Sequence, residues 1–180
     1  MVELTQKTPC AGLLPVTYGD VTLEEVNLGP ITSLSAFDDL SKMAAALKKA
    51  HGLSWPKPQE SHLKDDVRCL WFGRKEVLLT GVAPDESLRK HGAVVDQSDA
   101  WAVVSVNGEG TTDVLARLVP VDLRDSAMPV GATVRSQVQH MQGSITKLAS
   151  DEFIVMVFRS MATTLVHDMK QAMAAVATRK

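Results

Sequence analysis

Asp96 and Ser98 have the residue types and the position that acid–base chemistry requires. They lie within residues 94–98, at the end of an expected strand, where a side chain can extend into a cleft. The structural alternative is an Asx- or Ser-type turn, in which both side chains bond the local backbone. The turn is favoured, because aspartate and serine so often bond nearby backbone groups.

Two arginines are the other candidates for ligand binding. A guanidinium pairs well with a carboxylate, so the alternative is a small-ligand or folate-binding module, such as a transferase, in which Arg135 and Arg159 join Asp96. No further titrating groups cluster in the sequence. We therefore expect no catalytic residue on this chain.

Metal binding is not expected. The five histidines are far apart in sequence, and none pairs with a cysteine at ligand spacing. There is no HExxH and no CxxC. Surface or capping roles are predicted for His51, His62, His91, His140 and His167.

The two cysteines do not indicate a nucleophile, and there is no GxSxG elbow. Arg68 adjoins Cys69, but successive side chains of a strand point to opposite faces, so Cys69 is expected in the core beside Trp71. Cys10 follows Lys7 by three residues and is only a weak candidate for a reactive thiol. We expect free thiols in a reducing cytoplasm.

Residues 108–110 (Gly-Glu-Gly) precede an expected helix but lack the third glycine of a dinucleotide-binding loop. A plain strand-to-helix turn is favoured over an anion site, since Glu109 would repel an anion. Trp55, between Ser54 and Pro56 in a polar loop, has two interpretations. It is either an interface anchor or packed onto the chain's own surface.

Composition limits the class of protein. The chain has 180 residues, 45% of them hydrophobic, and a formal net charge of −2, which suits one compact domain or two small lobes sharing a core. No basic stripe is present, so nucleic acid is not an expected partner. No apolar run approaches the ~20 residues that span a bilayer, and the first residues lack a signal-peptide pattern. We expect a soluble cytoplasmic protein.

The first 66 residues are expected to contain an extended lead-in through Asp20, two strands, one helix and a loop. The helix is the clearest prediction, with acidic residues at its start, lysines near its end and Gly52 to stop it. The expected ranges are strands 21–28 and 31–36, a helix near 40–50, and a surface loop at 54–66.

From residue 67 onward, strands predominate, and Ser160 is predicted to cap the final helix. The last strand has apolar residues on both faces and should be central in its sheet. The expected strands are 67–72, 76–80, 93–95, 101–106, 132–138, 144–148 and 152–158. The expected helices are 84–92, 111–119 and 160–177, with a turn at 129–131.

A strand opening with an acid, at Glu76 and again at Glu152, completes a hairpin, and each hairpin is followed by a helix. This pattern predicts two related strand-turn-strand-helix lobes. The fold class is α+β, with mostly antiparallel sheets and helices packed on one side. We divide the chain into 1–66 and 67–180, joined in one compact unit.

From Val67 to Lys170, the order of short motifs resembles the gamma subunit of heterotetrameric sarcosine oxidase. That family is similar to a reduced glycine-cleavage T-protein, whose fold binds folate. The motifs are Leu70-Trp71-Phe72-Gly73, Glu76-Val77-Leu78-Leu79, Val95-Asp96-Gln97-Ser98 with Trp101, residues 114–123, Pro129-Val130-Gly131, Phe158-Arg159-Ser160-Met161-Ala162 and Leu165-Val166-His167-Asp168.

The resemblance implies a structural subunit without catalytic residues, in a complex that oxidatively demethylates sarcosine to glycine. It implies larger alpha and beta partners and a small delta partner, which carry FAD, FMN, NAD and zinc and pass the one-carbon unit to tetrahydrofolate. It also implies an exposed apolar patch or self-association of the isolated chain. The KGCYxGQE-type signature of stand-alone folate-binding relatives is absent, and the chain is much shorter than a T-protein.

Overall fold

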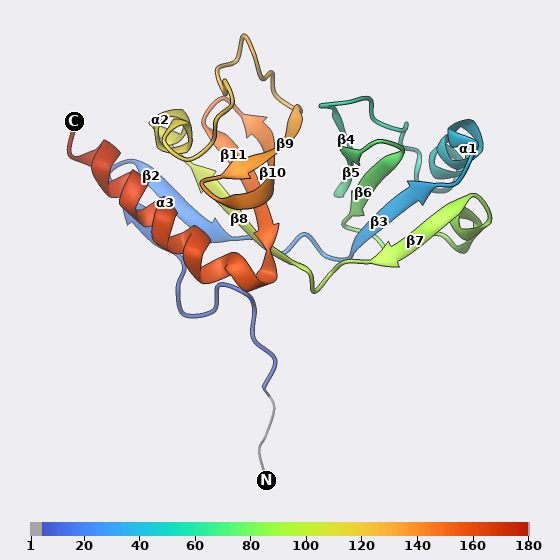
Figure 1. The fold of residues 1–180 in the computed structure, drawn as a ribbon, viewed down its shortest axis with the longest axis horizontal. Helices are drawn as coiled ribbons and strands as arrows, with labels where there is room; N and C mark the ends of the chain where they lie inside the picture. The colour runs from blue at the N-terminus through green and yellow to red at the C-terminus, as the bar shows by residue number, and fades with distance from the viewer. Residues whose placement is uncertain (1–4, 180) are drawn as a thin grey trace.

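Two antiparallel sheets dominate the structure, a computed structural model that describes residues 5–179 (Figure 1). The six-stranded sheet has the order β1 (Val16–Tyr18), β2 (Val21–Glu25), β8 (Trp101–Asn107), β11 (Glu152–Phe158), β10 (Met141–Ala149), β9 (Thr133–Val138). The five-stranded sheet has the order β4 (Ser61–Lys64), β5 (Val67–Gly73), β6 (Glu76–Thr80), β3 (Ile31–Ala36), β7 (Gly92–Asp96). The expected α+β class with antiparallel sheets is confirmed.

Few helices accompany the sheets. They are α1 (Leu40–His51), α2 (Thr111–Ala116), α3 (Ala162–Ala177) and the 3-10 helices η1 (Glu86–Lys90) and η2 (Arg159–Met161). Asp39 caps the start of α1 by accepting a hydrogen bond from the backbone N–H of Ser41, and Gly52 ends the helix in the left-handed conformation. The predicted start and stop signals of this helix are confirmed.

The helices lie on the outer face of each sheet, and the inner faces meet. Strand β11 shows why, because its side chains alternate between two cores. Phe153 and Val155 face α2 and α3, whereas Ile154 and Met156 contact the other sheet. Strand β11 lies between β8 and β10, so its predicted central place is confirmed.

The chain crosses between the sheets twice. Strand β2 pairs with β8 in one sheet, while β3, which follows β2, pairs with β7 in the other. The order of two strands, a helix, three strands and a helix runs from β2 to η1 and again from β7 to α3, with the short η2 before α3. In each run the second strand, β3 or β8, lies between the last strand of its own run and the first strand of the other run. Each sheet draws strands from both 1–66 and 67–180. That division of the chain, and the origin of the halves as related lobes, stay predictions.

The predicted loop at 54–66 is wrong in its last part, where β4 forms. This strand is at the edge of its sheet and has no fully buried residue, so it lacks the apolar alternation that marks most strands. Its neighbour Glu60 bridges to Ala132 beside β9, which links the two sheets along this side.

Some predicted boundaries also differ. Ser160 is not an N-cap, because it lies inside the 3-10 turn η2 and α3 begins at Ala162 without a side-chain cap. The α2 helix ends at Ala116 rather than near 119. Strand β2 stops at Glu25, where the chain leaves for the other sheet, and β10 begins at Met141 rather than 144.

Candidate functional site

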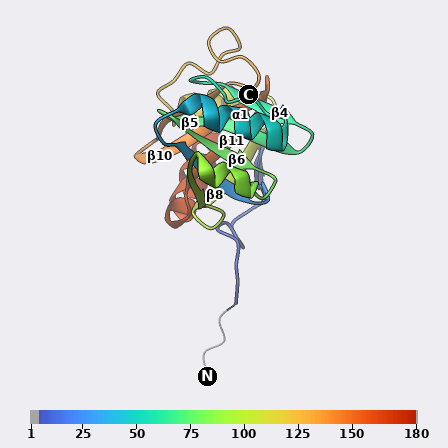
Figure 2. The ribbon, with the colours of Figure 1, turned by 90° about the vertical axis from the view of Figure 1, so that its right-hand side faces the viewer.

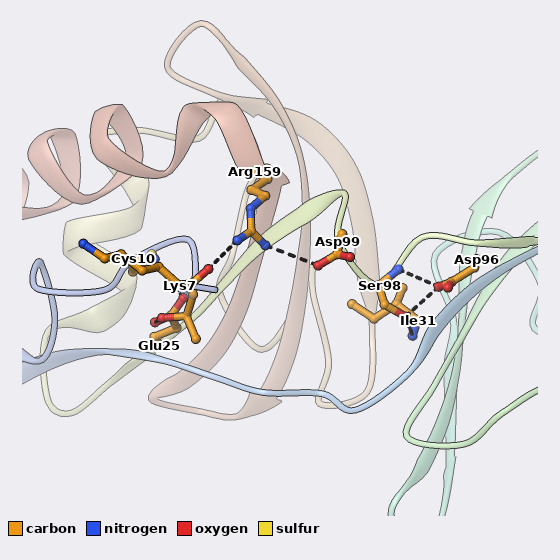
Figure 3. A network of polar contacts seen from close by, with 9 residues as sticks. Lys7, Cys10, Glu25, Ile31, Asp96, Ser98, Asp99 and Arg159 are labelled. Carbon is orange, nitrogen blue, oxygen red and sulfur yellow. Dashed lines mark hydrogen bonds and ion pairs between the residues drawn. The ribbon is translucent and has the colours of Figure 1, made fainter. Parts of the chain in front are cut away.

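A cleft of about 490 Å³ lies where the chain crosses between the two sheets. The N-terminal lead-in forms one wall, and the β2–β3 and β7–β8 connections form the others (Figure 3). Its lining residues are Gln6, Lys7, Thr8, Pro9, Glu25, Val26, Asn27, Leu28, Gly29, Ile31, Ser98, Asp99, Trp101, Val103 and Arg159.

Arg159, the first residue of η2 directly after β11, directs its guanidinium toward the lead-in. One N–H donates to the carbonyl oxygen of Lys7, 152 residues away in sequence. Another guanidinium nitrogen, Nη1, lies 3.6 Å from Oδ1 of Asp99, whose side chain is almost fully exposed (Figure 3). An ion pair of this length at the surface is weak, so the main contact of Arg159 is with the lead-in.

Glu25, at the end of β2, holds the same lead-in from the other side. Its Oε2 accepts a hydrogen bond from the Thr8 hydroxyl at 2.7 Å, and its Oε1 accepts one from the Cys10 N–H at 2.8 Å. Burial, together with the nearby Glu25 charge, raises the pKa of the Cys10 thiol to about 11. Cys10 is therefore protonated at neutral pH and is not an activated nucleophile.

Asp96 and Ser98 form the turn that the sequence favoured. Oδ1 of Asp96 accepts from the Ser98 N–H at 2.9 Å and from the Ser98 hydroxyl at 2.6 Å, and these bonds lower the pKa of Asp96 (Figure 3). The Ser98 hydroxyl oxygen in turn accepts from the Ile31 N–H at 3.1 Å. The pair thus fastens the β7–β8 connection to β3, and Asp96 itself does not line the cleft.

Trp101, in the cleft wall, has a buried indole N–H without a partner in the described range, which the sequence analysis did not predict. Its ring stacks on Phe158 with centroids 5.0 Å apart and makes a T-shaped contact with Phe72, with centroids 5.3 Å apart. Only 6% of the residue is exposed, and its indole N–H has no hydrogen-bond partner among residues 5–179. A buried donor without a partner lowers stability, which makes Trp101 an unusual element of a cleft wall.

Arg135 lies away from this cleft, between the sheets. It donates to the Phe72 carbonyl oxygen at 3.1 Å, and its guanidinium carbon lies 3.8 Å from the centre of the Phe72 ring. Burial lowers its pKa. The structure thus places Arg159 and Ser98 in the cleft wall, with Asp96 behind Ser98, and gives Arg135 a contact between β9 and β5.

The remaining candidates lie elsewhere. Trp55 is half-buried and packs against the core under α1, beside the chain's own five-stranded sheet, and its role as an interface anchor stays a prediction. Cys69 is fully buried in that core, as predicted, and burial raises the pKa of its thiol to about 12.

The Gly-Glu-Gly sequence at residues 108–110 forms a tight turn before α2. The backbone φ of Gly108 is 112°, and a Cβ there would lie 1.9 Å from the carbonyl oxygen of Asp20. The N–H and hydroxyl of Thr111 both donate to the Gly108 carbonyl oxygen. Glycine is required by this close approach between two turns.

Neither a metal site nor a membrane-spanning helix is found in residues 5–179. No group of three or more His, Cys, Asp or Glu side chains in this range is arranged to hold a metal ion. None of its helices has the length and apolar character needed to cross a bilayer.

Comparison with known proteins gives a match in fold. No protein-family model and no curated protein sequence matches the chain. A chain of the heterotetrameric sarcosine oxidase from Corynebacterium sp. U-96, solved with pyrrole 2-carboxylate, superposes with a TM-score of 0.81 at 22% identity, covering 96% of each chain. The glycine cleavage system aminomethyltransferase T from Bartonella henselae superposes with a TM-score of 0.56 at 15% identity.

The two matches differ in coverage. The aminomethyltransferase match includes 85% of this chain but only 46% of that enzyme, so the chain spans less than half of it. The sarcosine oxidase match is nearly complete in both directions, so the two chains are almost equal in length. This protein therefore has the fold of one chain of a heterotetrameric sarcosine oxidase, which is related to the fold of the T-protein.

Proposed function

We propose that this chain is the non-catalytic gamma-type subunit of a heteromeric sarcosine oxidase. In this proposal the complex oxidatively demethylates sarcosine to glycine and transfers the one-carbon unit to tetrahydrofolate. The observation that carries the proposal is the end-to-end match in fold and length with one chain of such an enzyme. The resemblance in the order of motifs between Val67 and Lys170 supports it independently of the structure.

The polar groups in the cleft wall and Asp96 behind it suit a structural role. Glu25 and Arg159 fasten the lead-in, and Asp96 fastens a turn. Both thiols carry raised pKa values. Turnover needs a nucleophile or general base with an orienting partner, whereas the side chains of Glu25, Arg159 and Asp96 are bonded to backbone groups.

The cofactors are proposed for the partners. FAD, FMN, NAD and zinc would be bound by the larger alpha and beta subunits and the small delta subunit, and tetrahydrofolate would be used there. This chain would contribute its two-sheet scaffold as a docking surface. We propose a cytoplasmic location for the whole complex.

Native co-purification tests the proposal. A tagged chain expressed in its own organism should recover a flavin-bearing sarcosine oxidase subunit, with flavin absorbance and sarcosine-dependent activity in the recovered complex. The isolated chain should show neither. Recovery of unrelated proteins, or activity from the isolated chain, would overturn the proposal.

A second candidate function is a small folate- or carboxylate-binding module. The cleft itself favours it, because Arg159, whose side chain is 38% exposed, lies in its wall and a guanidinium pairs well with a carboxylate. Titration of the isolated chain with a reduced folate and with a simple carboxylate tests this candidate. Saturable binding that Arg159→Gln abolishes, and that the exposed control Arg179→Gln retains, would support it. Absence of saturable binding would remove it.

A further inference from the structure

A second hollow, about 770 Å³ in volume, lies on the outer face of the five-stranded sheet, between α1 and η1. Figure 2 looks onto this face and shows the two helices side by side in front of the sheet. Its lining residues are Lys42, Ala45, Ala46, Lys49 and Ala50 from α1, and Asp85, Ser87, Lys90 and His91 from the η1 segment. We refer to it as the α1–η1 groove.

The α1 side of the groove is a single helical face. Its five residues follow the spacing i, i+3, i+4, i+7 and i+8, which places them in one stripe. Met43 and Leu47, on the adjoining face of the helix, are buried in the core, and Ala46 is partly buried against it. The stripe that lines the groove therefore has three alanines as its floor and one lysine in each of its two helical turns. Because alanine side chains are small, a protein backbone can approach the helix closely.

The charge of the groove is positive, although the whole chain has a formal net charge of −2. The side chains of Lys49 and Lys90 form no hydrogen bond or ion pair within residues 5–179, although the Lys49 charge contributes to lowering the pKa of Asp85. Lys42 has only a loose, exposed pair with Asp39, at 3.8 Å.

Asp85 is the one acid in the groove wall, and it is already occupied. Its Oδ1 accepts the Ser87 N–H at 2.9 Å as the cap of η1. Hydrogen bonds from the Ser87 side chain and backbone lower the pKa of Asp85, and the nearby Lys49 charge adds to this. Its backbone N–H donates to Nε2 of His51 at 3.3 Å, which ties η1 to the end of α1. Lys42 and Lys90, together with Lys49, whose charge Asp85 offsets only in part, are therefore left to attract a negative partner.

We infer that the α1–η1 groove binds an acidic segment of a partner protein, whose backbone lies over the alanine floor and whose carboxylates pair with Lys42, Lys49 and Lys90. The identity of the partner as another sarcosine oxidase subunit rests on the proposed function. The groove chemistry does not, because it follows from the lysines and the alanine floor alone.

The first test uses the isolated chain and a short fluorescent peptide of alternating Glu and Ala, followed by anisotropy. The chain should bind it saturably at low salt and lose it as salt is raised. The triple variant Lys42→Glu, Lys49→Glu and Lys90→Glu should bind at least about tenfold more weakly, since each exposed ion pair contributes about two- to fivefold.

The matched control is Lys57→Glu, Arg74→Glu and Arg179→Glu, which changes the net charge equally at exposed positions outside the groove. This control variant should bind the peptide about as tightly as the unaltered chain does. No binding by the unaltered chain, equal loss in both triple variants, or tighter binding of a single-stranded oligonucleotide would overturn the inference. If the glutamate variant fails to fold by circular dichroism, the Lys→Gln triple variant replaces it, with the same expected order.

The second test separates this inference from the proposed function. In co-purification, the groove variant should release the partner subunits at lower salt than the control. If both variants hold the subunits equally, the groove inference fails while the proposed function stands. If the unaltered chain recovers no sarcosine oxidase subunit but binds the peptide through the groove, the proposed function fails and the groove chemistry stands.

Discussion

The ammonium group of Lys147 lies 2.6 Å from Oδ1 of Asp125 and also donates to the Leu123 carbonyl oxygen at 2.7 Å. Only 1% of the Lys147 side chain is exposed, whereas 65% of the Asp125 side chain is. Its ammonium nitrogen lies 5.1 Å from the ring centre of Phe153, on the helix side of the six-stranded sheet. The buried ammonium group of Lys147 therefore anchors the long connection between α2 and β9 at Leu123 and Asp125.

Replacing Lys147 separates its packing from its charge. Lys147→Met keeps most of the volume, so the free energy of unfolding should change by less than about 1.5 kcal/mol, whereas Lys147→Ala opens a cavity and should cost about 2–4 kcal/mol. Both variants should speed hydrogen exchange of amides in residues 121–128, because the anchor of that segment is lost. Urea unfolding and hydrogen exchange measure the two effects. Unchanged exchange in both variants would show that Lys147 does not hold the segment.

Signals confined to a few residues were predictable from the sequence. The limits of α1 follow from Asp39 and Gly52, which act on backbone groups within one helical turn. The turn at Asp96 and Ser98 is likewise local. Such features depend on neighbours in the chain, so a single sequence contains them.

The cleft could not be predicted, because its contacts join distant parts of the chain. Arg159 was a candidate as a ligand group, but nothing near it in sequence indicates that it binds the Lys7 carbonyl oxygen. The pairing of β2 with β8 is equally non-local, because all five strands of the other sheet lie between them in the sequence. The unpaired indole N–H of Trp101 depends on the packing of two sheets and has no sequence signal.

Acid should destabilise the fold in a defined direction. Hydrogen bonds from Arg124 lower the pKa of Asp122 to about 2, and similar bonds lower the pKa values of Asp96 and Asp125. These carboxyls take up protons more readily in the unfolded chain, where their pKa is about 3.9, so their contribution is present above about pH 4 and is lost as pH falls toward 2.

The urea midpoint should therefore decrease steadily across that pH range. Asp122→Asn should give a shallower decrease, because one of the responsible groups is gone. The control Asp66→Asn removes an exposed carboxylate that accepts no hydrogen bond from the described residues, and it should follow the unaltered chain. Parallel curves for all three proteins would contradict the assignment to Asp122.

Both thiols should be inert in the folded protein. Cys10 and Cys69 are fully buried and have raised pKa values of about 11 and about 12, so neither provides an accessible thiolate near pH 8. A colorimetric thiol reagent should detect no reaction in native buffer and two thiols in denaturant. Cys10→Ser and Cys69→Ser should each leave one. Fast native reaction of a single thiol would show that its segment opens.

Two glycines provide a matched comparison of backbone strain with close packing. Gly12 and Gly108 have φ values of 77° and 112°, but a Cβ at Gly12 meets nothing within 4 Å, whereas one at Gly108 would lie 1.9 Å from the Asp20 carbonyl oxygen. Gly12→Ala should therefore cost about 1 kcal/mol of unfolding free energy, from the left-handed backbone alone. Gly108→Ala should cost about 3 kcal/mol or more, because backbone must also move. Equal losses in urea unfolding would show that the turn before α2 yields without displacing the β1–β2 turn.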